Sequence, residues 1–423
     1  MSHESSLAET DALAVPVVRE RSNVSPDRTS ARQPRQGAIT VEVATGERLT
    51  AIDADWRELV ARADVPNVFM HPALVRLAAQ SYDVPTPALL AWQRQPGGER
   101  LVGLWAFACI RAPQSMLPVT VLAAPPMPNA YLATPVIDRA CLEDTLVAML
   151  DRIAGDSALP GIIALDALTA DGATMRALTR VLAARGSAPC VFKTSQRPRL
   201  ASGLDGKRYM EQALSGGSRK KLRQQRRRLG EKGALEFRVI SEPGAVRTAF
   251  EDFLATEAAG WKGRQGTALA SDPADAAFAR DMIASLAQEG EAAIYALTLA
   301  GRPVSLQVVL RAGPAAYTWK TAYDERLHDY SPGMLLLEDY TAAFLADDGI
   351  AYVDSCAFDD TGFMATWRER QAVADMWIDV RRNASFTFAA FCRVQKTYLA
   401  FRSAAKTLYR RVLRRRAPNK GRG

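Results

Sequence analysis

The sequence predicts an α/β protein with mixed, largely antiparallel sheets flanked by helices, plus a basic amphipathic helix at the C-terminal end. Three observations support this fold class. Apolar runs with period-two alternation take turns with runs of helical spacing along residues 38–380. These runs form two α/β units of similar length and order. From residue 381 onward, a single apolar stripe of helical spacing continues among Lys and Arg.

The first unit is predicted over residues 38–205. It opens with a strand in AITVEVATGERLT, a helix over Asp53–Ala63, and a further helix after the turn in DVPNVFMHPALVRLAAQ. Alternating residues on both sides of a Pro-Gly-Gly turn predict a hairpin in PALLAWQRQPGGERLVGLWAFACIR. The helix LEDTLVAMLDRIA, the strand GIIALDAL and the helix GATMRALTRVLAARG complete the unit.

The second unit is predicted over residues 206–385. A basic helix, SRKKLRQQRRRLGEKG, leads into the strand LEFRVI, a helix over Gly244–Ala259 and the helix PADAAFARDMIASLAQEG. The strands AAIYALTLAG, RPVSLQVVLRAG and AAYTWKTAY form a predicted antiparallel meander. A Ser-Pro-Gly hinge, the helix MLLLEDYTAAFLA and the strand IAYVDSCAF follow.

Composition excludes several classes of protein. No apolar run reaches the roughly 18 residues of a membrane span, and residues 1–37 lack the apolar core of a signal peptide. We expect that segment to be a disordered leader. Five scattered cysteines and three histidines predict neither a disulfide framework nor a metal site, which fits a cytoplasmic protein.

Charge is unevenly distributed along the chain. Residues 381–423 contain 13 Lys and Arg and no acid, so removing them from the net charge of +8 leaves −5 for residues 1–380. A mildly acidic body with a cationic tail disfavours a general nucleic-acid-binding surface.

The hinge between strand and helix is the strongest candidate for an anion site. Ser331 is a favourable N-cap residue, Pro332 suits the first helical position, and Gly333 leaves room for a ligand. The unpaired N–H groups and positive dipole end of the first helical turn attract anions. We therefore predict that Tyr330, Ser331, Pro332, Gly333 and Met334 bind the donor cofactor. A well-capped structural helix is the alternative.

Four segments in this order resemble the CelD-like acyltransferases of the GNAT superfamily, relatives of the FemAB aminoacyl ligases: EAAGWKGRQGTAL, YTWKTAYDERLHDYSPGMLLLEDY, YVDSCA and WRERQAV. The likeness covers residues 45–380. It implies tandem GNAT-like units, with the pyrophosphate of acyl-CoA at a strand–turn–helix junction. It also implies acyl transfer to an envelope polysaccharide, peptidoglycan precursor, amino sugar or lipid. The usual Q/R-x-x-G-x-G/A loop is missing, and FemAB relatives use aminoacyl-tRNA as donor.

The candidate catalytic residues are Asp354, Asp324, Glu257 and Tyr323. Asp354 follows an apolar strand, so partial burial could tune it as a general base, with Asp324 or Glu257 as substitutes. A strand-end Asp that caps a turn is the alternative. Tyr323 could donate a hydrogen bond to an acyl carbonyl or to a leaving thiolate. Cys356 has no nearby His and is rejected as a nucleophile.

The candidate substrate-binding residues are Trp261, Lys262, Trp319, Lys320, Arg219 and Arg223. Each lysine follows a tryptophan, so a phosphate could pair with the lysine and a sugar or base could stack on the ring. Core tryptophans and surface lysines are the alternative. Arg219 and Arg223 belong to the basic helix, whose charge density suggests a polyanionic partner such as a nucleotide-linked acceptor, a phospholipid surface or tRNA.

The tail, residues 386–423, carries an apolar stripe made by Phe391, Val394, Tyr398, Phe401, Ala405, Leu408 and Val412. Lys and Arg surround this stripe, the pattern of a helix that lies on an anionic membrane surface over residues 386–416. A helix docked on its own domain is the alternative.

Three functions remain open at this point. The first is an acyl-CoA-dependent acyltransferase, peripheral on the inner face of the cell membrane. The second is a FemAB-type aminoacyltransferase that uses charged tRNA. The third is a non-catalytic scaffold of an envelope-assembly complex.

Overall fold

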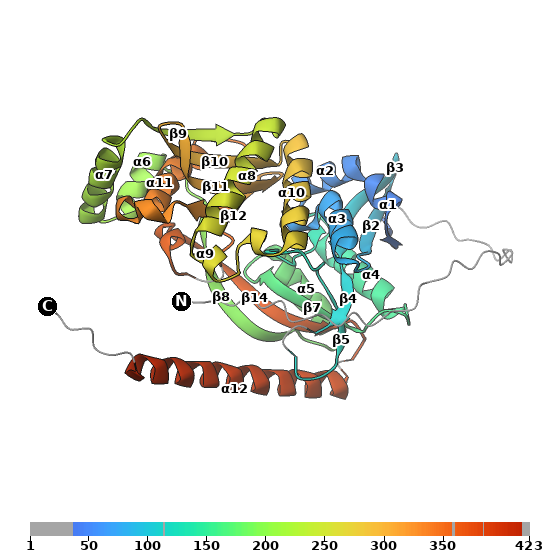
Figure 1. Cartoon of the computed structure of the whole chain (residues 1–423). Helices are drawn as coiled ribbons and strands as arrows, with labels where there is room; N and C mark the ends of the chain where they lie inside the picture. The colour runs from blue at the N-terminus through green and yellow to red at the C-terminus, as the bar shows by residue number, and fades with distance from the viewer. Residues whose placement is uncertain (1–36, 113–114, 358–359, 384, 417–423) are drawn as a thin grey trace, which may run out of the picture.

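A computed structural model describes residues 37–112, 115–357, 360–383 and 385–416. The predicted leader, apart from Gly37, lies outside the described residues. Figure 1 shows two lobes joined by long curved strands, with one long helix running beneath the body. The fold is mixed α/β, and its sheets are largely antiparallel and flanked by helices, as predicted.

The smaller sheet has four strands in the order β1-β2-β3-β6. Its strands are β1 (Ile39–Ala44), β2 (Ala88–Gln95), β3 (Gly98–Ala106) and β6 (Val136–Ile137), and all neighbours are antiparallel. The helices of this half are α1 (Glu47–Thr50), α2 (Asp53–Arg62), α3 (Pro72–Tyr82), α4 (Leu142–Ala154) and α5 (Ala173–Ala184). Helix α4 packs directly on β3, because a Cβ at Gly103 would come within 2.6 Å of Thr145.

The larger sheet has ten strands in the order β4-β5-β7-β14-β8-β13-β12-β11-β10-β9. Its strands from the first half are β4 (Ala108–Arg111), β5 (Thr120–Ala123), β7 (Ile162–Thr169) and β8 (Cys190–Leu200). The second half adds β9 (Leu235–Ile240), β10 (Ala292–Leu299), β11 (Arg302–Ala312), β12 (Ala315–Tyr323), β13 (Tyr352–Asp354) and β14 (Glu369–Asp379).

Each half of the chain contains one pair of parallel strands joined by a helical crossover. Strand β5 pairs with β7 in parallel, and β12 pairs with β13 in parallel. A helix lies between the two strands of each pair along the chain, α4 in the first case and α11 (Pro332–Leu345) in the second. Parallel strands need such crossovers. The domain boundaries at 205/206 and 385/386 stay a prediction, and β14 of the second predicted unit pairs with both β7 and β8.

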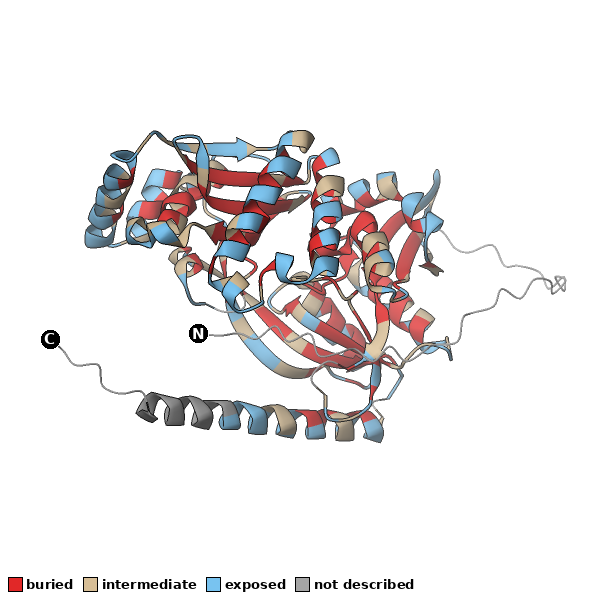
Figure 2. Cartoon of the chain, in the orientation of Figure 1, coloured by how far each residue is buried: buried red, intermediate tan, exposed pale blue. Residues whose placement is uncertain are grey.

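The second half is a three-layer sandwich. Helices α8 (Pro243–Ala259) and α10 (Pro273–Gln288) cover one face of β9–β12, while α6 (Gly206–Ala213), α7 (Gly216–Gly230) and α11 lie on the other. Successive side chains of β10 point to opposite faces of the sheet, so Ile294 packs in the core on the α8 side and Tyr295 in the core on the α11 side. Figure 2 shows the buried strands between these partly exposed helices.

Helix α12 (Phe386–Arg416) completes the chain as described. Within the described ranges, no helix is long and apolar enough to cross a membrane. That part of the chain also holds no group of three His, Cys, Asp or Glu suited to a metal ion.

Candidate functional site

The hinge after β12 is held by its neighbours in the fold. Asp324 caps the 3₁₀ helix η3 (Glu325–Tyr330) by accepting a hydrogen bond from the amide of Arg326 at 3.0 Å. Ser331 then turns the chain in the left-handed region, with φ of 50°. Its hydroxyl forms no cap, contrary to our expectation, because N-cap residues need an extended backbone. The hydroxyl instead accepts a hydrogen bond from the side-chain amide of Gln225 on α7 at 2.9 Å. Helix α7 thereby fixes the approach to α11.

The first turn of α11 faces the end of β12. A Cβ built on Gly333 would lie 3.7 Å from the ring of Tyr323, so the predicted donor and catalytic residues meet here. In this turn Pro332 has no N–H, and the N–H groups of Met334 and Leu335 donate to the backbone oxygen of Ser331. The N–H of Gly333 and the helix dipole are therefore what favours an anion here. Lys232 lies 5.5 Å above the ring of the half-buried Tyr330 and adds positive charge beside the hinge.

A β-bulge decides which way the side chains of β12 point. Lys320 lies opposite Val308 and Thr318 lies opposite Val309, which leaves Trp319 as the extra residue. Alternation is therefore reset after the bulge, so Lys320 points to α8, whereas Tyr323 faces α11.

Lys320 meets a carboxylate and a second lysine. Glu257, at the end of α8, lies 3.1 Å from the Lys320 ammonium and 2.9 Å from that of Lys262 on α9 (Trp261–Arg264). Its other oxygen accepts a hydrogen bond from the Leu269 amide at 2.9 Å. Only 1% of the Glu257 side chain and 5% of the Lys320 side chain are exposed. We call Glu257, Lys262 and Lys320 the lysine–carboxylate cluster.

The cluster carries one net positive charge when all three groups are ionised. Burial raises the pKa of Glu257, but Lys262, Lys320 and the Leu269 amide outweigh burial and hold this pKa below its ordinary value. Burial lowers the pKa of Lys320, although Glu257 opposes the shift. Glu257 thus pairs with two lysines and can neutralise only one of them. The remaining positive charge would stabilise an anionic ligand or transition state.

A small cavity of about 30 Å³ opens beside the cluster. Its lining includes Glu257, Lys262, Trp261 and Tyr323. Glu325 spans the mouth, because its carboxylate accepts a hydrogen bond from the Trp261 amide at 2.6 Å and pairs with Arg264 at 2.6 Å. Helix α9 packs closely against the end of α8 and needs Gly263 there, because a Cβ at this position would lie 1.8 Å from the backbone oxygen of Ala258.

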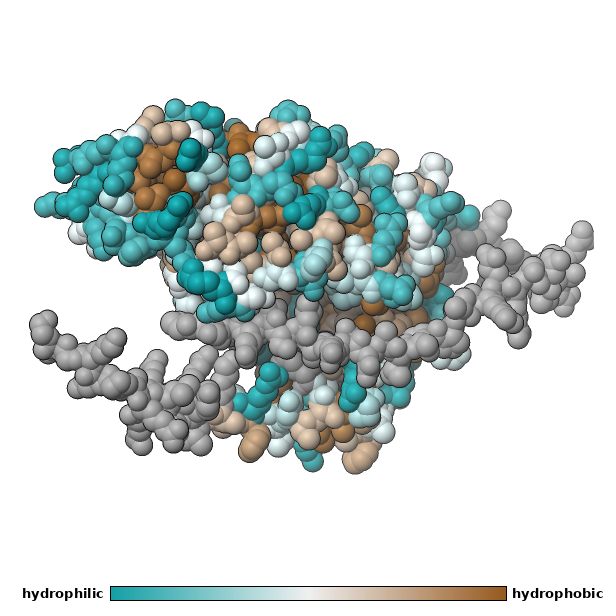
Figure 3. All heavy atoms as spheres, viewed as in Figure 1, coloured by the Kyte–Doolittle hydropathy of each residue, from teal (hydrophilic) through white to brown (hydrophobic). Residues whose placement is uncertain are grey.

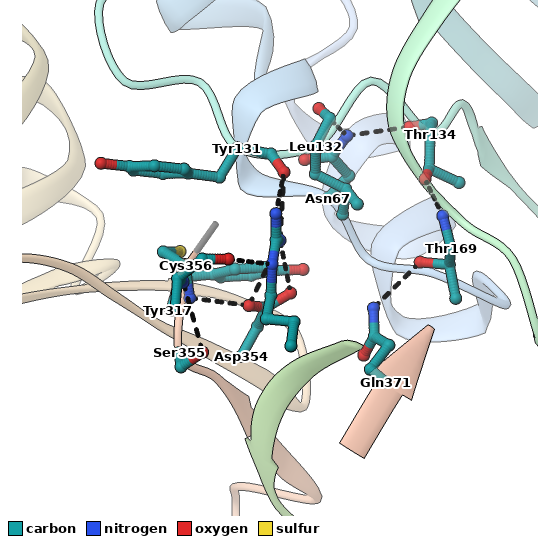
Figure 4. Close-up of polar contacts among 12 residues, drawn as sticks. Asn67, Tyr131, Leu132, Thr134, Thr169, Tyr317, Asp354, Ser355, Cys356 and Gln371 are labelled. Carbon is teal, nitrogen blue, oxygen red and sulfur yellow. Dashed lines mark hydrogen bonds and ion pairs between the residues drawn. The ribbon is translucent and has the colours of Figure 1, made fainter. Parts of the chain in front are cut away.

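Asp354 lies elsewhere, at the junction of the two halves. Its carboxylate pairs with Arg197 of β8 at 3.2 Å and accepts a hydrogen bond from the Cys356 amide at 2.7 Å. Arg197 also donates to the backbone oxygen of Tyr131, so a buried polar cluster joins the halves (Figure 4). Burial raises the pKa of the Cys356 thiol well above its ordinary value, which agrees with its rejection as a nucleophile.

Trp319 belongs to the same junction. Its ring is 2% exposed, and its indole N–H donates to the backbone oxygen of Asn129 at 3.0 Å. This burial leaves no ring face open to a sugar and agrees with the alternative of a core tryptophan. Trp261, in contrast, is 43% exposed at the mouth of the cavity.

The remaining predicted residues lie apart from the cavity. Asp324 is held by Arg326, whose hydrogen bonds keep the pKa of Asp324 below its ordinary value. Arg219 and Arg223 line a groove of about 600 Å³ between α6, α7 and α11. The structure thus brings together Glu257, Trp261, Lys262, Lys320 and Tyr323 with the hinge, and separates Asp354, Trp319 and the two arginines from them.

Three residues that shape these sites are not indicated by the sequence patterns. Glu325 closes the cavity, Gln225 fixes the hinge, and Arg197 neutralises Asp354. Glu325 is adjacent to Asp324 and lies within the segment YTWKTAYDERLHDYSPGMLLLEDY. The other two come from distant elements, and only the fold reveals their partners.

Comparisons with known proteins support this description. Residues 216–363 match the family model of the acetyltransferase (GNAT) domain, so this part of the chain carries a GNAT-type domain. The matched range includes α7, the lysine–carboxylate cluster and the hinge. No curated protein is similar enough in sequence to count as a match.

Solved structures resemble the chain over most of its length. A crystal structure of FemX has a TM-score of 0.56 at 12% identity, covering 78% of this chain and 96% of FemX. L-PGS from Bacillus licheniformis has a TM-score of 0.44 at 11% identity, with 84% and 98% covered. A tandem GNAT protein from the clavulanic acid pathway has a TM-score of 0.40 at 12% identity, with 80% and 98% covered. The FemX likeness shows the fold alone, and the other two scores are too low to carry an argument.

Proposed function

We propose that this chain is an acyltransferase of the CelD-like type. It would move an acyl group from acyl-CoA or a similar thioester to an amine or hydroxyl of a cell-envelope polysaccharide, sugar or lipid precursor. The matched GNAT domain supports acyl transfer. The observation that carries the proposal is the contact of Gly333, in the first turn of α11, with Tyr323, at the end of the bulged strand that holds Lys320.

The cluster would act through charge and position. A nucleophile attacks the thioester carbonyl, the new C–N or C–O bond forms, and the C–S bond breaks. Lys262, the more exposed lysine, would stabilise the oxyanion, while Lys320 and Glu257 hold it in place. Tyr323 would give its proton to the leaving thiolate, and the proton of the nucleophile would pass to water. The tyrosinate would then take a proton back from water, which restores Tyr323.

A general base is not part of this proposal. Each predicted carboxylate is held by a cation: Asp354 by Arg197, Asp324 by Arg326 and Glu257 by two lysines. The lowered pKa values of Asp324 and Glu257 make these two groups weak bases. Orientation of the reactants can supply on the order of 7–11 kcal/mol of catalysis without one. We therefore propose that Asp354 positions the junction between the halves.

The donor site can be tested at Gly333. Gly333→Asp should abolish CoA binding in calorimetry, because its carboxylate would repel the phosphates. Gly333→Ala is the matched control, since a Cβ has 3.7 Å of clearance and should leave binding nearly unchanged. Equal CoA affinity in the wild type and in Gly333→Asp would remove the hinge from the donor site.

The donor itself has an alternative, charged tRNA in a FemAB-type reaction. The exposed cations of α7 beside the hinge favour this reading. Thermal stabilisation by CoA and not by tRNA supports the thioester, whereas a salt-sensitive tRNA complex supports the alternative. No response to either, with retained membrane binding, supports a non-catalytic scaffold. Mass spectrometry of envelope glycans and lipids, with and without the protein, would identify the acceptor.

We also propose a cytoplasmic location, peripheral on the inner face of the cell membrane.

A further inference from the structure

Helix α12 docks on the body through one face only. Phe388 and Cys392 are buried in a small core with Cys190 of β8 and Trp377 of β14. Gln395, one turn further, is also buried. Ser385 fixes the start of the helix by accepting a hydrogen bond from the Phe388 amide at 3.0 Å. The N-terminal part of α12 is therefore a fixed element of the structure (Figure 2).

Over residues 386–405, whose side chains the structure describes, the opposite face of α12 exposes large apolar side chains to solvent. Among the described residues, seven large hydrophobic side chains are exposed, and three of them belong to α12: Phe386 (88%), Val394 (41%) and Phe401 (74%). At 3.6 residues per turn, these three point within about 80° of each other and roughly opposite to Phe388 and Cys392. We call Phe386, Val394 and Phe401 the outward face. In Figure 3, hydrophobic atoms project from the lower edge of the molecule, where α12 runs.

Cations border the outward face on one side. Ala390 and Thr397 lie between its members, and the exposed Arg393 and Lys396 lie about 20° and 80° from Phe386 on that side. A cluster of exposed apolar side chains bordered by polar residues marks an interaction site. The predicted stripe is thus only partly correct. Val394 and Phe401 point outward, whereas Phe391 packs against the docked core, whose buried members Phe388 and Cys392 the stripe leaves out. The side chains of Leu408 and Val412 lie outside the described residues.

The positive charge of the C-terminal segment indicates what kind of partner covers the outward face. Residues 381–423 contain 13 Lys and Arg and no acid, so whatever covers the outward face must tolerate or attract a strongly cationic helix. A second copy of α12 would bring like charges together. An anionic lipid surface offers both an apolar layer for the phenylalanines and negative headgroups for the cations.

We propose that the outward face of α12 lies in the headgroup layer of an anionic membrane, while its inward face keeps the helix on β8 and β14. The body is thereby held at the membrane in one orientation, since the docked part of the helix cannot turn freely. This goes beyond acyl transfer, because the proposal concerns the surface at which the protein works and holds whatever the donor.

Vesicle sedimentation with the full chain tests the proposal. We expect binding to vesicles of phosphatidylglycerol and phosphatidylcholine, with at least tenfold weaker binding to pure phosphatidylcholine. Phe386→Ser/Phe401→Ser should weaken binding to the anionic vesicles by at least tenfold. Its melting temperature should stay at that of the wild type, because both side chains point away from the body.

Val239→Ser on β9 is the matched control, since Val239 is 47% exposed but lies far along the sheet from α12. It should bind vesicles like the wild type. Unchanged binding of the double variant, or equal binding to neutral and anionic vesicles, would overturn the proposal. So would a wild-type dimer in analytical ultracentrifugation that the double variant converts to monomers, because the outward face would then be an interface between copies. Failure here leaves CoA binding at Gly333 untouched, so the two proposals are separable.

Discussion

Glu257→Gln is the most direct perturbation of the lysine–carboxylate cluster. The glutamine oxygen can still accept the hydrogen bond from the Leu269 amide, but the substitution removes the negative charge that pairs with Lys262 and Lys320. Lys262 is 25% exposed and retains a hydrogen bond to the backbone oxygen of Thr321, so water can solvate its charge. The Lys320 side chain is only 5% exposed and loses its counter-ion inside the protein.

The size of the effect follows from that orphaned charge. Removing one partner of a buried ion pair costs about 3–5 kcal/mol of unfolding free energy, and we expect Glu257→Gln to fall in this range. Glu257→Gln/Lys320→Met removes the orphaned charge as well. The double variant should therefore recover at least ~2 kcal/mol relative to Glu257→Gln, since losing both partners costs less than losing one.

Urea denaturation at pH 7, followed by tryptophan fluorescence, measures both values. The matched control is Glu236→Gln on β9, because Glu236 pairs with Arg238 at 2.6 Å on the surface. Breaking this exposed pair should cost at most about 1 kcal/mol. A loss of stability in Glu257→Gln as small as that of the control would contradict this prediction, and so would further destabilisation of the Glu257→Gln protein by Lys320→Met.

Three other outcomes are expected. The ion pairs of Glu257 should stabilise the wild type fully above pH 4.5, the ordinary pKa of Glu257, and this stabilisation should be lost as the pH falls through the lower pKa of the folded state. The free energy of unfolding should therefore fall more steeply with acid in the wild type than in Glu257→Gln. Parallel curves for the two proteins would refute this prediction. Asp354→Asn should cost about 3–5 kcal/mol in urea, because Arg197 is left unpaired inside the junction, and a loss below 1 kcal/mol counts against a structural ion pair. Glu325→Ala should speed hydrogen exchange at the Trp261 amide several-fold with a change of at most about 1 kcal/mol in global stability, whereas unchanged exchange means that Glu325 does not close the cavity.

Local sequence patterns predict most single elements. Strands β9 and β12 and helix α4 have the bounds that their periodicity indicates, because alternation and helical spacing are properties of short segments. Strand β8, CVFKTSQRPRL, does not stand out. It contains Pro198 and the buried Arg197, and its polar residues are accepted because β13 and β14 pair with both of its edges.

In the candidate site, contacts between residues close in sequence could be predicted, and contacts between distant segments could not. Tyr323 and Gly333 are close in sequence, so their meeting at the hinge follows from a strand–turn–helix pattern. The partner of Asp354 is 157 positions away on β8, and no local pattern indicates which arginine neutralises that carboxylate. Burial of Trp319 is equally invisible, because it depends on how the first half packs against β12.

The position of β14 affects how the protein is made. While the ribosome is still translating the second half, β7 and β8 have no strand between them, and the backbone groups that β14 will pair remain bare. The native pairing of β7 and β8 with β14 cannot be complete until residue 379 has emerged. A chaperone that shields these two strands should raise the yield of native protein, and chains that stop before residue 369 should aggregate.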